Sequence, residues 1–148
     1  MGRGWGHTMP ISNYTTKISP DTTIGEISRM LSRFGAQRII VDYADGEASL
    51  MQFMLDVKGK KVFFQLPCNA EGVLVTLQRD RVPAQYRTPL QARRVAWRII
   101  RDWVEAQIAI VDAGQAAMAE VFLPYAVGQD GTTLYSQMEA GKIKLLEP

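Results

Sequence analysis

The most distinctive chemical feature of the sequence is a block of arginines near its middle. Residues 79–101 carry seven arginines, one aspartate and no lysine, a net charge of +6 within a 148-residue chain of formal net charge +2. The seven are Arg79, Arg81, Arg87, Arg93, Arg94, Arg98 and Arg101. A guanidinium presents five N–H donors in a planar fork that matches phosphate and carboxylate oxygens and stacks on rings. The block therefore predicts a site for an anionic ligand.

A structural role explains the same block without any ligand. Residues 102–148 carry seven acids against Lys142 and Lys144, a net charge of −5. Arginines on one helix face can remain solvated, or they can pair with such acids within the chain or between subunits. The sequence leaves both interpretations open.

Aromatic side chains lie in and around the arginine block. Stacking on aromatic rings, combined with arginine forks, is how proteins hold bases and phosphates together. The expected ligand-binding residues are Arg87, Arg94, Trp97, Arg98, Arg101 and Tyr125. We expect Arg94, Arg98 and Arg101 to contact phosphate, and Trp97 or Tyr125 to stack on a base.

Residue types that perform catalysis are scarce. The chain has one histidine, His7, and one cysteine, Cys68, so neither a His-rich metal site nor an internal disulfide can form. Neither a P-loop nor a strand-linked dinucleotide motif is present. We expect Cys68 to be a small buried residue. The sequence therefore predicts a protein that is not an enzyme and uses neither a cofactor nor a metal.

Composition places the chain in an ordinary globular class. Hydrophobic residues make up 47% and charged residues 22%, values that argue against disorder. No apolar run approaches the roughly 18–20 residues of a membrane span. We expect a cytoplasmic protein without membrane contact, with a flexible tail at 1–12 and a single α+β domain at 13–148.

The first half of that domain is expected to be an N-terminal helix on a three-stranded antiparallel meander. Thr23 followed by Glu26 indicates a capping box, and apolar residues at helical spacing continue the helix over about 23–34. Asp45-Gly46 and Lys58-Gly59 are hairpin turn signals. The expected strands are 37–43, 47–57 and 60–66.

The second half is expected to be helical, with one long helix. Thr88 as N-cap, Pro89 and Gln91 are strong start signals for a helix that runs to about Ala113. Its apolar stripe is expected to be Ala92, Ala96, Ile99, Trp103, Ala106 and Ile110. Asn69 is expected to cap an earlier helix. The shorter helices are expected at about 70–80, 115–123 and 134–140.

One face of the meander carries an apolar row that a three-stranded sheet does not need. Ile40, Met54 and Phe63 share this face. Either a later helix or a second subunit should cover them. Together with the long helix, this row predicts a homo-oligomer.

Four segments carry a resemblance to a known group of proteins. They are KISPDTTIGEI (17–27), the Leu66-Pro67 strand end, RRVAWRIIRDWVEAQ (93–107) and EVFLPY (120–125). Together they resemble a family of small phage and prophage proteins, over about residues 13–136. This resemblance implies a protein of the bacterial host cell, and by analogy a counter-defence protein that sequesters nucleotide signals of bacterial immunity.

Three functions follow as hypotheses. The first is a non-enzymatic, oligomeric binder of a small anionic ligand of nucleotide type. The second is a nucleic-acid-binding phage protein that uses the same arginines. The third is a protein–protein inhibitor or adaptor with the arginine helix as its contact surface, because arginine and tryptophan are common at binding hot spots.

Overall fold

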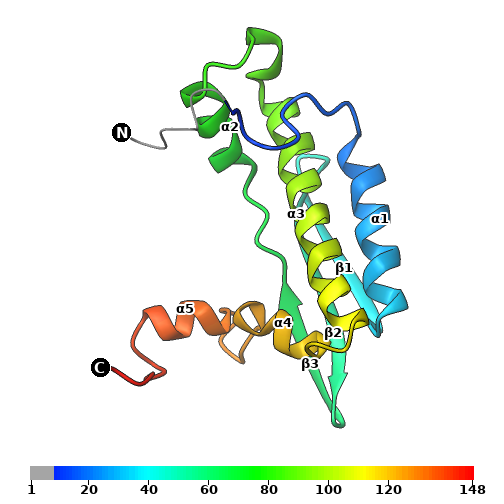
Figure 1. Ribbon diagram of the computed structural model, residues 1–148, viewed down its shortest axis with the longest axis vertical. Helices are drawn as coiled ribbons and strands as arrows, with labels where there is room; N and C mark the ends of the chain where they lie inside the picture. The colour runs from blue at the N-terminus through cyan, green and yellow to red at the C-terminus, as the bar shows by residue number, and fades with distance from the viewer. Residues whose placement is uncertain (1–8) are drawn as a thin grey trace. The chain divides into compact units, whose positions relative to one another are not determined.

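The computed structural model describes residues 9–148 and confirms the α+β class (Figure 1). An N-terminal helix is followed by a three-stranded antiparallel sheet and a helical half with one long helix. The expected tail at 1–12 lies for the most part outside the described residues, as does His7. The helices are α1 (Pro20–Arg33), α2 (Ala70–Arg79), α3 (Pro89–Asp112), α4 (Met118–Val121) and α5 (Leu134–Glu139). The strands are β1 (Arg38–Ala44), β2 (Glu47–Val57) and β3 (Lys60–Gln65).

The chain folds into two compact units that share the helices α1 and α3. Unit 1 consists of Met1–Ile27 and Cys68–Glu105, and unit 2 of Ser28–Pro67 and Ala106–Pro148. The first part of each shared helix belongs to unit 1 and the last part to unit 2. The arginine block lies entirely in unit 1, and the sheet lies entirely in unit 2.

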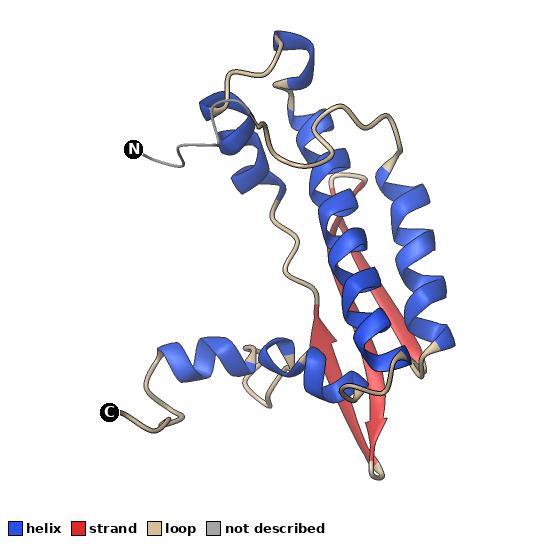
Figure 2. Cartoon of the chain, in the orientation of Figure 1, coloured by secondary structure: helices blue, strands red, loops and turns tan. Residues whose placement is uncertain are grey.

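The sheet of unit 2 has the expected meander order, β1-β2-β3, drawn in red in Figure 2. Both hairpins turn where the sequence predicts, because Asp45-Gly46 and Lys58-Gly59 all adopt positive φ, from 51° to 88°. Two positive φ angles in a two-residue turn match the right-handed twist of the paired strands. The strand bounds differ from the predicted ones by at most one residue.

An aromatic cluster forms the core of unit 2. Phe53 of β2 stacks on Phe64 of β3 with ring centroids 5.2 Å apart, and Phe122 meets Phe53 edge-on at 5.2 Å. All three side chains are at most 1% exposed. The segment after α4 therefore anchors to the sheet through Phe122.

The two edges of the sheet differ. At the β3 edge, the Val127 N–H donates to the Phe63 carbonyl at 2.7 Å, and Ala126 forms a bridge with Phe64. At the other edge, β2 is the only strand of the described chain that pairs with β1. On the sheet face that carries Ile40, Met54 and Phe63, only Met54 is buried, at 6% exposure. A partner that covers this row stays a prediction.

Helix α1 begins earlier than the sequence predicts. The Ser19 hydroxyl accepts from the Thr22 N–H at 3.2 Å, and Pro20 occupies the first helical position. Ser19 is therefore the N-cap, and the interpretation of Thr23 and Glu26 as a capping box was wrong. A serine followed by proline is an equally good start signal, and it frees Thr23 and Glu26 for other partners.

The caps of α2 and α3 are confirmed. The Asn69 side chain accepts from the Gly72 N–H at 3.0 Å, and the Thr88 hydroxyl accepts from the Gln91 N–H at 3.1 Å. Between these helices a small core forms around Leu77, Val82 and Ala92. Five partly buried residues pack against it: Ile11, Tyr14, Val73, Leu74 and Tyr86.

The buried side of α3 differs from the expected stripe. Ala92 and Ala96 are buried as predicted, but Ala106 and Ile110 are exposed. The buried apolar positions are Ala92, Val95, Ala96, Trp97, Ile100, Val104 and Ile108. Apolar residues occur on more than one side of α3, so periodicity alone did not fix which side faces the interior.

Replacing Phe122 by alanine should destabilise the protein strongly. The change leaves a cavity between buried rings, which costs about 3–5 kcal/mol of unfolding free energy. Leu123→Ala is the matched control, because Leu123 is 49% exposed and its loss should cost less than about 1 kcal/mol. Urea denaturation followed by circular dichroism measures both. Equal losses would contradict the aromatic anchor.

Candidate functional site

A row of polar side chains runs along one face of α3 in unit 1. Gln91, Arg94, Arg98 and Arg101 are spaced three, four and three residues apart, which puts them on one side of a helix. In unit 1 this side meets the chain that leads into α1 and the first turns of α1 itself. The row contains three of the predicted ligand-binding arginines.

Gln91 holds the N-terminal segment at the start of the row. Its side chain is buried, and its amide nitrogen donates to the carbonyl oxygens of Tyr14 at 2.9 Å and Thr16 at 2.8 Å. Buried polar groups are nearly always hydrogen-bonded in this way. The sequence predicted Gln91 only as part of a helix start, so this contact was missed.

The Glu26 carboxylate bridges two of the arginines. Arg98 donates through Nη1 to Glu26 Oε2 at 3.1 Å and to the Thr23 hydroxyl at 3.2 Å. Arg101 donates through Nε to Glu26 Oε1 at 3.0 Å. Each oxygen of one carboxylate thus receives a different guanidinium. The partly buried side chains are 13–26% exposed, so water weakens these pairs less than it does on an open surface.

Arg101 contacts two further acids on its own helix. Its Nη1 lies 2.8 Å from Glu105 Oε1 and 3.4 Å from Asp102 Oδ1. Asp102 also accepts from the Asn13 side-chain amide at 2.9 Å. Two arginines therefore meet three carboxylates, and this end of the row carries no excess positive charge. Glu26, the acid that joins Arg98 and Arg101, comes from the first third of the chain rather than the last.

The bridge shifts the ionisation of its members. Burial raises the pKa of Glu26, but hydrogen bonds and charge from Arg98 and Arg101 outweigh it, so the pKa lies below its ordinary value. Burial lowers the pKa of Arg101, but hydrogen bonds to Glu26 and Glu105 outweigh this effect, so the pKa lies above its ordinary value. Both shifts favour the charged pair.

Arg94 differs from the other two arginines of the row. Its Nη1 donates to Gln91 Oε1 at a long 3.4 Å, and its Nε is buried without a hydrogen-bond partner. Within residues 9–148 it forms no ion pair. Arg87 lies exposed just before α3, and it also forms no ion pair in this part of the chain. These two guanidiniums have the capacity to bind an external anion.

Of the two predicted aromatic residues, one is buried and the other belongs to unit 2. Trp97 is 1% exposed, so it presents no open ring face on which a base could stack. Tyr125 belongs to unit 2, whereas the arginine row belongs to unit 1. Charged neighbours of Trp97 in the sequence suggested exposure, but the Trp97 side chain itself packs into the interior. Within unit 1, the structure thus brings Arg98 and Arg101 together on Glu26, with Arg94 on the same side of α3.

Other reactive groups add little chemistry. Burial raises the pKa of the Cys68 thiol to about 12, so the thiol stays protonated at neutral pH. No cluster of three or more His, Cys, Asp or Glu side chains in residues 9–148 is arranged to hold a metal ion. Across the same residues, every helix is too short or too polar to span a bilayer.

Comparison with known proteins gives no relative on which to draw. No protein-family model, no curated protein and no solved structure matches the chain.

Replacing Glu26 by glutamine should lower the unfolding free energy by about 1–3 kcal/mol at neutral pH, because two partly buried guanidiniums lose their shared charge partner. The folded-state pKa of Glu26 lies below its ordinary value. Its contribution is therefore present above pH ~4.3 and is lost as the pH falls through the folded-state value. Urea denaturation between pH 3 and 7 measures this loss.

Glu105→Gln is the control for this measurement. Glu105 is 58% exposed and pairs with Arg101 over one helical turn, so its removal should cost only about 0.3–0.5 kcal/mol. A Glu26→Gln effect as small as this, or one that does not shrink at low pH, would contradict the bridge.

Proposed function

We propose that the protein is a non-enzymatic binder of a small anionic ligand of nucleotide type. The observation that carries the proposal is Arg94, whose guanidinium has a buried, unpartnered Nε and no carboxylate partner within residues 9–148. An unsatisfied buried donor on a cation is costly unless something accepts from it. A phosphate bound at the same guanidinium would supply the anionic partner that it lacks.

The surroundings of Arg94 support an anion rather than a cation. Arg94 lies in the second turn of α3, after the exposed Arg87. The start of a long helix carries a partial positive charge from its N–H groups, which attracts phosphate. We propose that Arg87 and Arg94 make the first phosphate contacts. Arg98 and Arg101 would join only where a second phosphate displaces the Glu26 carboxylate.

We infer the source of the ligand only from the sequence resemblance to small phage proteins. A phage protein without catalytic groups could act in the bacterial cytoplasm by holding a host nucleotide signal away from its receptor. Such sequestration needs only tight binding, which is consistent with a site made of arginines and with a multivalent, oligomeric protein. The proposed role is therefore counter-defence by sequestration.

Isothermal titration of cyclic and ADP-ribose-derived nucleotides should reveal a tight ligand. Arg94→Ala should then weaken binding by about 10–100-fold, the size expected for charge-assisted hydrogen bonds, and Arg94→Lys should recover part of the loss. Arg29→Ala is the matched control, because Arg29 is an exposed arginine of unit 2. If no nucleotide in the series binds, or if Arg94→Ala and Arg29→Ala lose affinity equally, the proposal is overturned.

A second candidate is nucleic-acid binding, favoured by a separate observation. Arg79, Arg81 and Arg87 are exposed on and around the loop between α2 and α3. Arg79 reaches Asp80 at 3.3 Å but keeps 57% of its side chain exposed. Three exposed cations on and around one loop suit several phosphates of a nucleic-acid backbone.

Salt dependence separates the two candidates. If these three arginines neutralise three phosphates, the affinity for duplex DNA should fall about 40-fold between roughly 50 and 200 mM salt. Fluorescence anisotropy with a labelled duplex measures this, and an Arg81→Ala, Arg87→Ala double variant should flatten the slope. The absence of binding at the lower salt concentration would exclude this candidate.

A further inference from the structure

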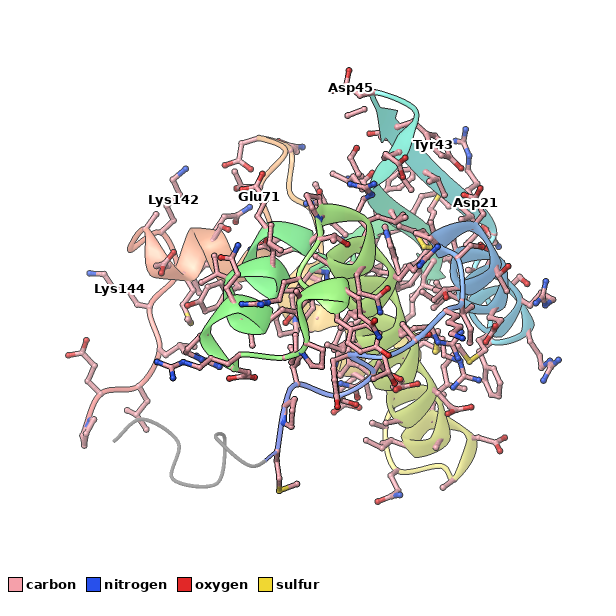
Figure 3. All side chains as sticks on the ribbon, turned by 90° about the horizontal axis from the view of Figure 1, so that it is seen from above. Asp21, Tyr43, Asp45, Glu71, Lys142 and Lys144 are labelled. Atoms are coloured by element: carbon pink, nitrogen blue, oxygen red, sulfur yellow. The ribbon has the colours of Figure 1, made fainter. Side chains whose placement is uncertain are left out.

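Strand β1 offers an open edge of the sheet in unit 2. Its burial pattern contains no buried residue, and β2 is its only strand partner in the described chain. Tyr43 is 59% exposed, and Figure 3 shows Tyr43 and Asp45 toward the turn of the β1–β2 hairpin. A free strand edge has unpaired N–H and C=O groups that can accept another strand.

The C-terminal tail has the pattern of a strand but no strand partner. Residues 142–148 adopt neither helix nor strand. They read Lys-Ile-Lys-Leu-Leu-Glu-Pro, which begins with alternating basic and apolar residues. Leu145 is 66% and Leu146 98% exposed. Figure 3 shows Lys144 projecting from the ribbon, whereas Lys142 Nζ lies 3.4 Å from Asp130 Oδ2. Leaving two leucines in water gives up favourable burial.

The tail and the β1 edge are complementary in a single antiparallel register. Setting Lys144 opposite Asp42 also sets Leu146 opposite Ile40 on the same face. On the other face, the same register sets Ile143 opposite Tyr43 and Leu145 opposite Val41. Opposite charges and apolar pairs directly across two strands each stabilise the pairing.

The charges at the two ends of this register are complementary as well. Glu147 comes to the end of β1 that begins with Arg38, and Lys142 comes to the end near Asp45. A parallel arrangement would instead place the two lysines toward Arg38. The charges at both ends therefore favour the antiparallel direction.

We propose that residues 142–147 of one copy of this chain add to the β1 edge of a second copy as a fourth, antiparallel strand. A second copy is the occupant because the tail begins near the other edge of the sheet, which is formed by β3. The helix α5 that precedes it contacts the segment Leu123–Tyr125, which in turn contacts β3. The tail of the same chain would have to cross the sheet to reach β1.

This mode of self-association does not depend on the proposed ligand. If two copies exchange tails reciprocally, both free edges close and the assembly stops at a dimer. If the exchange is not reciprocal, a ring or longer assembly forms. In either case Leu145 and Leu146 leave water, and Lys144 gains a carboxylate partner.

Light scattering after size-exclusion chromatography tests the need for the tail. At micromolar concentration the full chain should have at least twice the 16.6 kDa of one copy, and a chain that ends at Gly141 should be a monomer. A full chain that stays monomeric, or a truncated chain that still associates, would overturn the proposal.

Charge reversal tests the register. Asp42→Lys and Lys144→Asp should each weaken association at least tenfold, because like charges then face each other. The double variant should associate nearly as the original chain does, since the pair is restored with its signs exchanged. Failure of the double variant to recover would overturn the register, provided circular dichroism shows that all three variants are folded.

Cysteine crosslinking shows whether the strand comes from another copy. In a Cys68→Ala background, Asp42→Cys protein is mixed with Lys144→Cys protein and oxidised. A disulfide between the two proteins should form, and mixing with Leu145→Cys protein should yield far less, because that side chain faces the other side of the sheet. A crosslink confined to single chains that carry both Asp42→Cys and Lys144→Cys would assign the strand to the same molecule and overturn the proposal.

Discussion

The bridge from Glu26 to Arg98 and Arg101 is the interaction on which unit 1 depends. It joins α1 to α3 through one carboxylate that receives both guanidiniums at 3.0 and 3.1 Å. Gln91 extends the same connection by holding two carbonyl groups of the segment before α1. The bridge also determines the charge of the row, because it neutralises Arg98 and Arg101, whereas Arg94 has no acidic partner within residues 9–148.

Local structure could be predicted from the sequence because its causes lie within a few residues. Asn69 and Thr88 cap helices through hydrogen bonds to N–H groups three residues away, and each hairpin turn is set by two residues. The partners of Arg98 and Arg101 lie 72 and 75 positions away. A local sequence pattern cannot predict a contact between residues so far apart in the chain. The sequence therefore predicted the arginines but not the acid that pairs with them.

Two further features show the same limit. Trp97 has charged neighbours along the chain but is buried, because its direction is set by which side of α3 packs inward. The alternation in residues 142–146 is visible in the sequence, whereas the open β1 edge that matches it becomes visible only once the strand order is known. Assembly through the tail would place several arginine rows in one particle, and ligand capture would gain from that multivalency.

The central claim is that Glu26 occupies Arg98 and Arg101 and leaves Arg94 to receive an external anion. Nuclear magnetic resonance of the arginine Nε–H groups tests it most directly, during titration with a nucleoside diphosphate. The account predicts that the Arg94 signal shifts first, while the Arg101 Nε–H stays protected by its hydrogen bond to Glu26. Shifts confined to Arg98 and Arg101, or an Arg94 signal that never moves with any nucleotide, would contradict it.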